Sequence, residues 1–374
     1  MAAAGLIADV TVPAHLEAAE PPEARGLRRD EVRLLVSHVD TDSFDHVRFN
    51  DLPPLLSAGD LLVVNTSGTL KAAVIATSDE DTFELHLSTE LPGGLWTVEL
   101  RQPGPIASLP SRAARAGTTL RLPEGGSATL LAPYPFARSL ASQSRLWIAA
   151  LELPMALMSY LDRHGFPIRY SYVKESWPIA MYQTVFANEF GSAEMPSAAR
   201  PFTPELVTTL VSRGIQIAPV VLHTGVASLE DHEPPYEEFY RVPTETAERI
   251  NHARRRGFRI IAVGTTVVRA LESVTDEHGS TARGEGWTRV VITRDRKLRS
   301  VNGLITGLHE PRATHLAVLE AVAAAARNGA TGGASFHTAT HLRRAYAAAT
   351  EAGYLWHEFG DSHLIIGGQD PQNR

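Results

Sequence analysis

The stretch Phe258-Arg-Ile-Ile-Ala-Val-Gly-Thr-Thr-Val-Val-Arg-Ala-Leu-Glu272 decides the fold class. Its first six residues are apolar except for Arg259 and have the length of a buried strand. Gly264-Thr265-Thr266 then leads directly into a helical segment, 267–272. A strand that passes straight into a helix is the repeating unit of an α/β sheet with parallel strands. The segment therefore predicts an α/β fold.

The surrounding sequence repeats this alternation of strand and helix. A helix is expected to start at Thr203-Pro204-Glu205, where Thr203 is the N-cap, and to stop at Gly214, before the buried strand 215–222. Further apolar strands are expected at 33–36 and 61–64, and further helices at 244–256, 314–327 and 338–350. These segments complete the expected α/β core.

Residues 70–150 have a different pattern. Short β-rich runs, separated by Gly, Pro, Ser and Asp, follow one another at a spacing of ~8–12 residues. Such spacing is typical of a small barrel or sandwich. We therefore expect an α/β core domain made of residues 1–69 and 151–374, with residues 70–150 as an inserted small β-barrel domain.

Composition limits the possible functions. The chain has 374 residues, 44% of them hydrophobic, and a formal net charge of −7. It contains no cysteine, which excludes thiolate nucleophiles and Cys-ligated zinc. It shows neither a secretory signal nor the ~20 uncharged apolar residues of a membrane helix, so we expect a soluble, cytoplasmic protein without a membrane partner. The acidic balance does not favour nonspecific nucleic-acid binding.

Polar turns follow two of the expected strands. Gly264, Thr265 and Thr266 offer hydroxyl and main-chain donors at a helix start, and His223-Thr224-Gly225 follows the neighbouring strand. Small molecules usually bind at this edge of an α/β sheet, so the two turns together favour a shared pocket. Taken singly, each turn also fits a capped helix or a structural histidine. The loop from Gly191 to Ala198 is a third small-residue turn, in which Glu194 is able to face a cation, or else a plain surface loop.

Taken in order, these motifs resemble one family, the S-adenosylmethionine:tRNA ribosyltransferase-isomerases of queuosine biosynthesis. The resemblance covers about residues 29 to 367 and rests on the following segments: Leu61-Leu62-Val63-Val64-Asn65, Tyr182-Gln183-Thr184, Gly191-Ser192-Ala193, Leu222-His223-x-Gly225, Glu238-Phe239-Tyr240, Gly264-Thr265-Thr266 with Arg269 and Glu272, His309-x-Pro311 and Phe359-Gly360-Asp361.

The resemblance implies an α/β core with a β-barrel insertion and a reaction without metal. S-adenosylmethionine is the substrate whose ribosyl part moves onto the aminomethyl group of 7-aminomethyl-7-deazaguanine in tRNA. Adenine and methionine leave, and the product is epoxyqueuosine. The implied partners are therefore S-adenosylmethionine and a tRNA that carries the deazaguanine base.

The resemblance also implies roles for single residues. The sulfonium acidifies the neighbouring C5′ protons, so a general base is able to start the reaction. The candidates for catalysis are His223, His309 and Glu238. The candidates for binding S-adenosylmethionine are Tyr182, Gln183, Gly191, Ser192, Glu194, Thr224, Gly225, Tyr240, Gly264, Thr265, Thr266, Arg269 and Glu272. No metal ligand is expected.

Several positions depart from the family pattern. Asn65-Thr66-Ser67-Gly68 stands where the family has Asn-Asp-Thr-Arg, and Pro201 stands where it has a histidine. Because polar groups that recognise a substrate are not interchangeable, two alternatives stay open. One is an enzyme that uses S-adenosylmethionine on a small-molecule acceptor or cleaves it without tRNA. The other is a non-catalytic nucleoside-binding protein.

Overall fold

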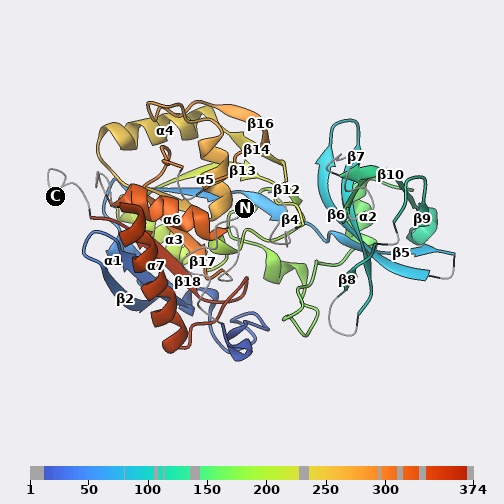
Figure 1. Cartoon of the computed structure of the whole chain (residues 1–374), viewed down its shortest axis with the longest axis horizontal. Coiled ribbons are helices and arrows are strands. Elements are labelled where there is room, and N and C mark those ends of the chain that lie inside the picture. Colours follow the sequence, from blue (N-terminus) through green and yellow to red (C-terminus); the bar gives the residue numbers. More distant parts are fainter. Residues whose placement is uncertain are drawn as a thin grey trace.

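The protein is described by a computed structural model with two lobes, an α/β lobe and a β-barrel lobe (Figure 1). The structure describes residues 12–79, 81–104, 108–112, 114–134, 144–226, 236–293, 296–309, 315–327 and 334–368. Pro311, which belongs to one motif of the resemblance, lies outside these residues. The short strands β4 (Ser67–Thr69) and β12 (Glu189–Ser192) pair in parallel where the lobes meet (Figure 1).

A nine-stranded mixed sheet forms the centre of the α/β lobe. Its strands, in spatial order, are β16 (Gly284–Thr288), β14 (Glu238–Val242), β13 (Gln216–Leu222), β3 (Leu61–Asn65), β15 (Ile260–Val263), β17 (Gly303–Gly307), β18 (Ser362–Ile366), β1 (Arg33–His38) and β2 (Ser43–Arg48). Strands β13, β3, β15 and β17 run parallel to one another. The parallel arrangement predicted from the alternating pattern is confirmed for these four strands.

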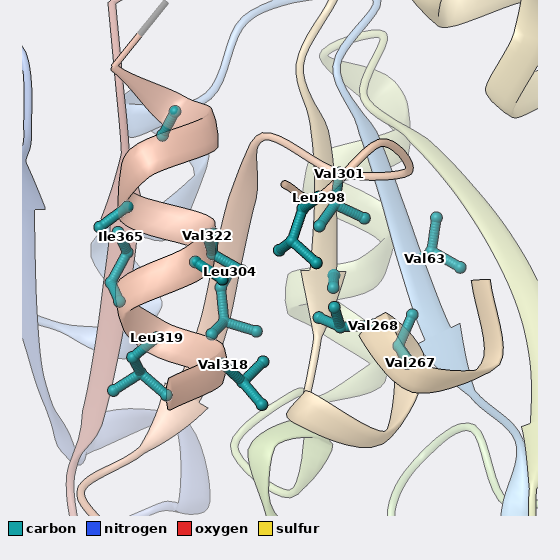
Figure 2. Packing of buried hydrophobic residues seen from close by; sticks show 14 of the residues in the cluster. Val63, Val267, Val268, Leu298, Val301, Leu304, Val318, Leu319, Val322 and Ile365 are labelled. Atoms are coloured by element: carbon teal, nitrogen blue, oxygen red, sulfur yellow. The ribbon is translucent and has the colours of Figure 1, made fainter. Parts of the chain in front are cut away.

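Alternation along each strand divides the core between the two faces of the sheet. Leu61 and Val63 of β3 pack on one face with helices α4 (Thr244–Arg255), α5 (Thr265–Glu272), α6 (His315–Ala326) and α7 (Ala334–Glu351). Figure 2 shows this face. Val63 of β3 lies near Val267 of α5, and Leu304 of β17 lies near Val322 of α6. Leu62 and Val64 pack on the other face with α1 (Leu52–Leu55) and α3 (Pro204–Ser212). Both faces are covered, which explains why these strands read as continuous apolar runs.

The helix boundaries follow the signals in the sequence. The Thr203 hydroxyl accepts a hydrogen bond from the amide of Leu206 at 3.1 Å, so Thr203 is the N-cap of α3 as predicted. Gly264 precedes α5 with φ of 101°, a conformation that side chains other than glycine rarely adopt. That glycine turns the chain from β15 into α5 at the edge of the sheet.

The second lobe is the predicted β-barrel. Its strands are β5 (Ala73–Ser78), β6 (Asp81–Leu91), β7 (Leu95–Gln102), β9 (Thr119–Arg121), β10 (Ser127–Tyr134) and β11 (Leu146–Glu152), with β8 (Leu109–Pro110) added beside β7. The barrel closes because β11 pairs with β7. Its core also takes in Tyr160 and Leu161 of α2 (Leu157–His164), and Ile168 beyond it. The fold class predicted from the sequence, an α/β core with an inserted β-barrel, is therefore confirmed.

Within the described ranges, no helix is both long and apolar enough to cross a membrane.

Candidate functional site

The candidate site lies at the carboxyl edge of the sheet, where the four parallel strands end. Asn65 ends β3, His223 follows β13, Gly264 follows β15 and His309 comes two residues after β17. Since parallel strands end at the same edge, residues far apart in the sequence are brought together there. The structure therefore gathers the turns that the sequence singled out along one edge.

Hydroxyl groups and an imidazole form a hydrogen-bonded chain at this edge. The Oγ atom of Ser192 lies 2.6 Å from Oγ of Ser67, which in turn lies 2.7 Å from Nδ1 of His223. The amide of Thr224 donates to Oγ of Ser192 at 3.0 Å and so fixes the start of the chain. Asn65 holds the two strand ends together, since its side chain bonds both the amide and the carbonyl of Leu222. The hydrogen-bonded groups therefore come from β4, β12 and the residue after β13, and Asn65 at the end of β3 holds β13 in place.

His223 continues this chain to a carboxylate. Its Nε2 atom lies 3.6 Å from Oε1 of Glu189, and Glu189 is held by two hydrogen bonds from Arg241, at 2.8 and 3.2 Å. The imidazole also stacks on Phe239 at a ring distance of 5.7 Å. On its other side the ring lies close to Gly191, where a Cβ atom would stand 2.6 Å from the imidazole. The imidazole is therefore held on several sides in one orientation.

The charge state of His223 follows from its surroundings. The side chain is 16% exposed. Burial lowers the pKa of His223 below the usual 6.5, while the carboxylate of Glu189 opposes that shift. The imidazole is therefore mainly neutral near pH 7 and able to accept a proton. A carboxylate beside Nε2 would stabilise the imidazolium that forms.

Glu238 and Arg269 form an ion pair that fastens the turn after His223 to helix α5. The Glu238 carboxylate accepts a hydrogen bond from the amide of Gly225 at 3.0 Å and pairs with Arg269. Arg269 also donates to the carbonyl of Tyr236 at 3.1 Å. Each side chain of the pair is 14% exposed. Both carboxylate oxygens are thus used within the fold, and this arrangement suits positioning of the turn.

The turn after β15 and the end of β17 lie next to each other. The amide of Gly264 donates to the carbonyl of Ile305 in β17 at 2.8 Å, and a Cβ atom on Gly264 would stand 3.6 Å from that of Ala198. Thr265 is buried and Thr266 is half-buried in the first turn of α5. His309 lies further along the same edge, with Nε2 at 2.7 Å from the Thr306 hydroxyl.

Three other predicted residues lie beside β4 and β12. The side-chain amide of Gln183 bonds both main-chain groups of Thr69, at 3.0 and 2.7 Å, in the manner of a neighbouring strand. Tyr182 is buried against Phe359, and burial raises its pKa to about 12. The carbonyl of Glu194 accepts a hydrogen bond from Thr224 at 2.6 Å. Gln183 and Tyr182 therefore support the strand that carries Ser67.

Two predicted residues are not brought to this edge. Glu272 ends α5, and its Oε1 atom accepts hydrogen bonds from the amides of Arg299 and Ser300, at 2.8 and 2.9 Å. Tyr240 packs against the main core, with its hydroxyl near Gly284. Both side chains serve the interior of the lobe rather than the candidate site.

Sequence reasoning missed Ser67, Glu189 and Arg241. Ser67 stands in a segment noted for its departure from the family, and Arg241 follows the Glu238-Phe239-Tyr240 motif. On β14, alternate residues face opposite sides, so Phe239 and Arg241 point toward His223 while Glu238 and Tyr240 point away. The alternation of side chains along a strand is thus a sequence signal from which Arg241 could have been predicted.

Among the described residues, no group of three or more His, Asp or Glu side chains is placed to hold a metal ion.

Comparison with known proteins gives consistent results. A family model described as queuosine biosynthesis protein matches residues 9–365. The S-adenosylmethionine:tRNA ribosyltransferase-isomerase of Desulfitobacterium hafniense is 32% identical over 90% of this chain and 94% of that protein. The protein of that name from Heliobacterium modesticaldum is 33% identical over 90% of this chain and 94% of its own length.

A solved structure agrees. The crystal structure of an S-adenosylmethionine tRNA ribosyltransferase from Thermotoga maritima is similar with a TM-score of 0.51 and 28% identity, over 96% of this chain and all of that chain.

Proposed function

The chain belongs to the queuosine biosynthesis protein family, and from this premise we propose that it is an S-adenosylmethionine-dependent ribosyltransferase-isomerase that acts on tRNA. It transfers and isomerises the ribosyl part of S-adenosylmethionine onto 7-aminomethyl-7-deazaguanine in tRNA. The products are epoxyqueuosine in the tRNA, adenine and methionine. The reaction takes place in the cytoplasm, and no metal takes part.

The observation that carries this proposal is the chain of groups from Ser192 through Ser67 and His223 to Glu189. The reaction needs a base that is neutral near pH 7 and close to a nucleoside bound at the sheet edge. His223 meets both needs, because burial lowers its pKa and it follows β13 directly. In this role His223 removes a proton from C5′ of S-adenosylmethionine, which the neighbouring sulfonium acidifies.

The neighbouring turns supply donors for the nucleoside. Thr265 and Thr266 offer hydroxyl groups, and the first turn of α5 offers main-chain amides at the positive end of the helix. Gly264, whose φ of 101° suits glycine, sets the turn at which these donors lie. His309, at the same edge, is a second proton-transfer group.

The test is an assay of product release. The purified protein is incubated with S-adenosylmethionine, with and without tRNA that carries 7-aminomethyl-7-deazaguanine, and adenine and methionine are quantified. We expect release only when this tRNA is present. Release without tRNA would indicate cleavage of S-adenosylmethionine or another acceptor, and binding without any release would indicate a nucleoside-binding protein.

His223→Gln tests the role of the base. Loss of a general base lowers the rate by about 100-fold or more. The matched control is His252→Gln, on the exposed side of α4, which should leave the rate unchanged. Because the neutral imidazole is the active form and its pKa lies below 6.5, the wild-type rate should be flat around pH 7 and fall only at lower pH. An unchanged rate in His223→Gln would remove His223 from the mechanism.

A further inference from the structure

A second concave region lies at the same edge, beyond β17. It is a pocket lined by Gly307 at the end of β17, by Ser197 and Arg200 after β12, by Arg29, and by Glu358 and Asp361 before β18. Ser197 begins the short helix that holds Ala198 against Gly264. The pocket is therefore next to the turn to which the proposed function assigns the nucleoside.

Glu358 is the unusual group in this pocket. Its Oε2 atom is buried and has no hydrogen-bond partner among the residues that the structure describes. Burial raises the pKa of its carboxyl to about 7. A buried carboxylate oxygen without a donor costs free energy, so such an oxygen is usually satisfied by an ordered water or by a ligand that supplies the donor.

The other charged groups of the pocket are already satisfied within the fold. Arg200 donates to Glu23 at 2.8 Å and to the carbonyl of Met181 at 2.9 Å. Arg29 donates to Glu23 at 3.2 Å. Asp361 accepts from the main-chain amides of Arg33 and Leu355, both at 2.7 Å. Glu358 is thus the acidic group of the pocket with capacity left for a ligand.

The backbone next to Glu358 is strained. His357 has φ of 73°, in the left-handed region that residues other than glycine seldom adopt. It is held there by stacking on Tyr172 at 4.3 Å and by a hydrogen bond from its amide to the carbonyl of Leu308 at 3.2 Å. Strain of this kind is usually retained where it places a functional group. Here it places Glu358 at the pocket.

We propose that Glu358 binds a primary ammonium group of a substrate. An ammonium carries three donors and a positive charge, so it would satisfy Oε2 and favour the ionised carboxylate. This inference rests on the proposed function, whose donor and acceptor each carry such a group: the α-ammonium of S-adenosylmethionine and the aminomethyl group of the deazaguanine base. The position of the pocket beside Gly264 suits either substrate.

The first experiment tests the donor. Binding of S-adenosylmethionine to wild type and to Glu358→Gln is measured by calorimetry, together with binding of the deaminated analogue that keeps the sulfonium and the carboxylate. If Glu358 holds the α-ammonium, the variant binds S-adenosylmethionine about tenfold more weakly or worse, because a charge-assisted hydrogen bond is lost. The analogue should bind both proteins equally.

The second experiment tests the acceptor. Binding of free 7-aminomethyl-7-deazaguanine is compared with that of the same base carrying a hydroxymethyl group. If Glu358 holds the aminomethyl group, Glu358→Gln weakens binding of the first base by about tenfold and leaves the second unchanged. A selective loss in either experiment supports the proposal and identifies which substrate carries the ammonium.

Controls keep the outcome unambiguous. Glu351→Gln removes an exposed carboxylate of α7 and should alter neither affinity. The thermal midpoint of Glu358→Gln should not fall, because a neutral amide replaces a carboxyl that is costly to ionise. The proposal is overturned if the variant binds all four ligands as wild type does, or loses affinity equally for ligands with and without the ammonium. These are binding measurements, so they remain decisive even if the release assay shows no ribosyl transfer.

Discussion

At the scale of single residues, the site depends on a glycine that leaves room for a ring. A Cβ atom on Gly191 would stand 2.6 Å from both Cε1 and Nδ1 of His223, well inside contact distance. In Gly191→Ala the imidazole must move and lose its 2.7 Å contact with Ser67. We expect the rate of adenine release to fall by about tenfold or more, as small misplacements of a catalytic group do.

The control for this substitution is Gly93→Ala. Gly93 lies in a barrel turn with φ of 82°, and nothing stands within 4 Å of its hypothetical Cβ. The control therefore carries backbone strain without touching His223, and it should keep its activity. Equal activity of Gly191→Ala and wild type would show that the position of the ring is not critical.

A second prediction at this scale concerns His363 and acid. The side chain is fully buried in β18 and lies 2.7 Å from the Ser37 hydroxyl, and burial lowers its pKa to about 3. The unfolded chain binds a proton near pH 6.5, whereas the folded chain does not until about pH 3. This histidine therefore leaves stability unchanged above pH 6.5 and lowers it as the pH falls toward 3.

The expected loss from His363 alone is about 2 kcal/mol of unfolding free energy at pH 5. Denaturant unfolding at pH 7 and pH 5 measures it, with His363→Gln for comparison. The variant should lose less stability than wild type between the two pH values. An identical loss in both proteins would mean that His363 does not titrate in this way.

At the scale of elements, the N-cap of α3 is a defined source of stability. Thr203 accepts from the amide of Leu206 and also donates to the buried carboxylate of Asp30 at 3.1 Å. Thr203→Ala removes both bonds, and we expect a loss of about 1 kcal/mol or somewhat more in denaturant unfolding. Thr203→Ser keeps the hydroxyl and should lose much less. Neither change should alter the affinity for S-adenosylmethionine.

Local sequence patterns predicted the positions of strands and helices better than they predicted the contacts between these elements. Apolar runs and capping residues predicted β3, β13, β15 and α3 because these signals lie within the segments themselves. The pairing of β4 with β12 brings Ser67 to Ser192 across more than a hundred residues, and no short pattern announces it. His223 and Gly191 could be named because they stand in short motifs of the sequence. Ser67 and Glu189 could not, because their contacts with His223 depend on this long-range pairing.

The placement of Glu272 shows the same limit. The sequence correctly put Glu272 on the helix that follows Gly264. However, eight residues of helix extend about 12 Å, so the last of them lies far from the edge at which the helix begins. Position within a helix, and not only membership of it, decides which residues reach a site.

At the scale of the whole molecule, the barrel has a hydrophobic core of its own. Leu85, Val98 and Leu120 lie at its centre, and Tyr160 of α2 and Ile168 join the same cluster. We therefore propose a barrel domain that extends from about residue 70 to residue 168. A fragment of these residues should fold by itself, with a β-rich circular dichroism spectrum and a cooperative thermal transition. A fragment without such a transition would show that the barrel needs the α/β lobe to fold.

The two lobes are nevertheless joined beside His223. The amide of Val226 donates to the hydroxyl of Ser88 in β6 at 3.0 Å, and a Cβ atom on Gly225 would stand 2.7 Å from that oxygen. Strand β6 of the barrel thus supports the turn that follows His223. A compound that binds between β6 and this turn would inhibit the enzyme without resembling a nucleoside. Substitutions in the barrel near Ser88 would change the activity although they lie outside the site.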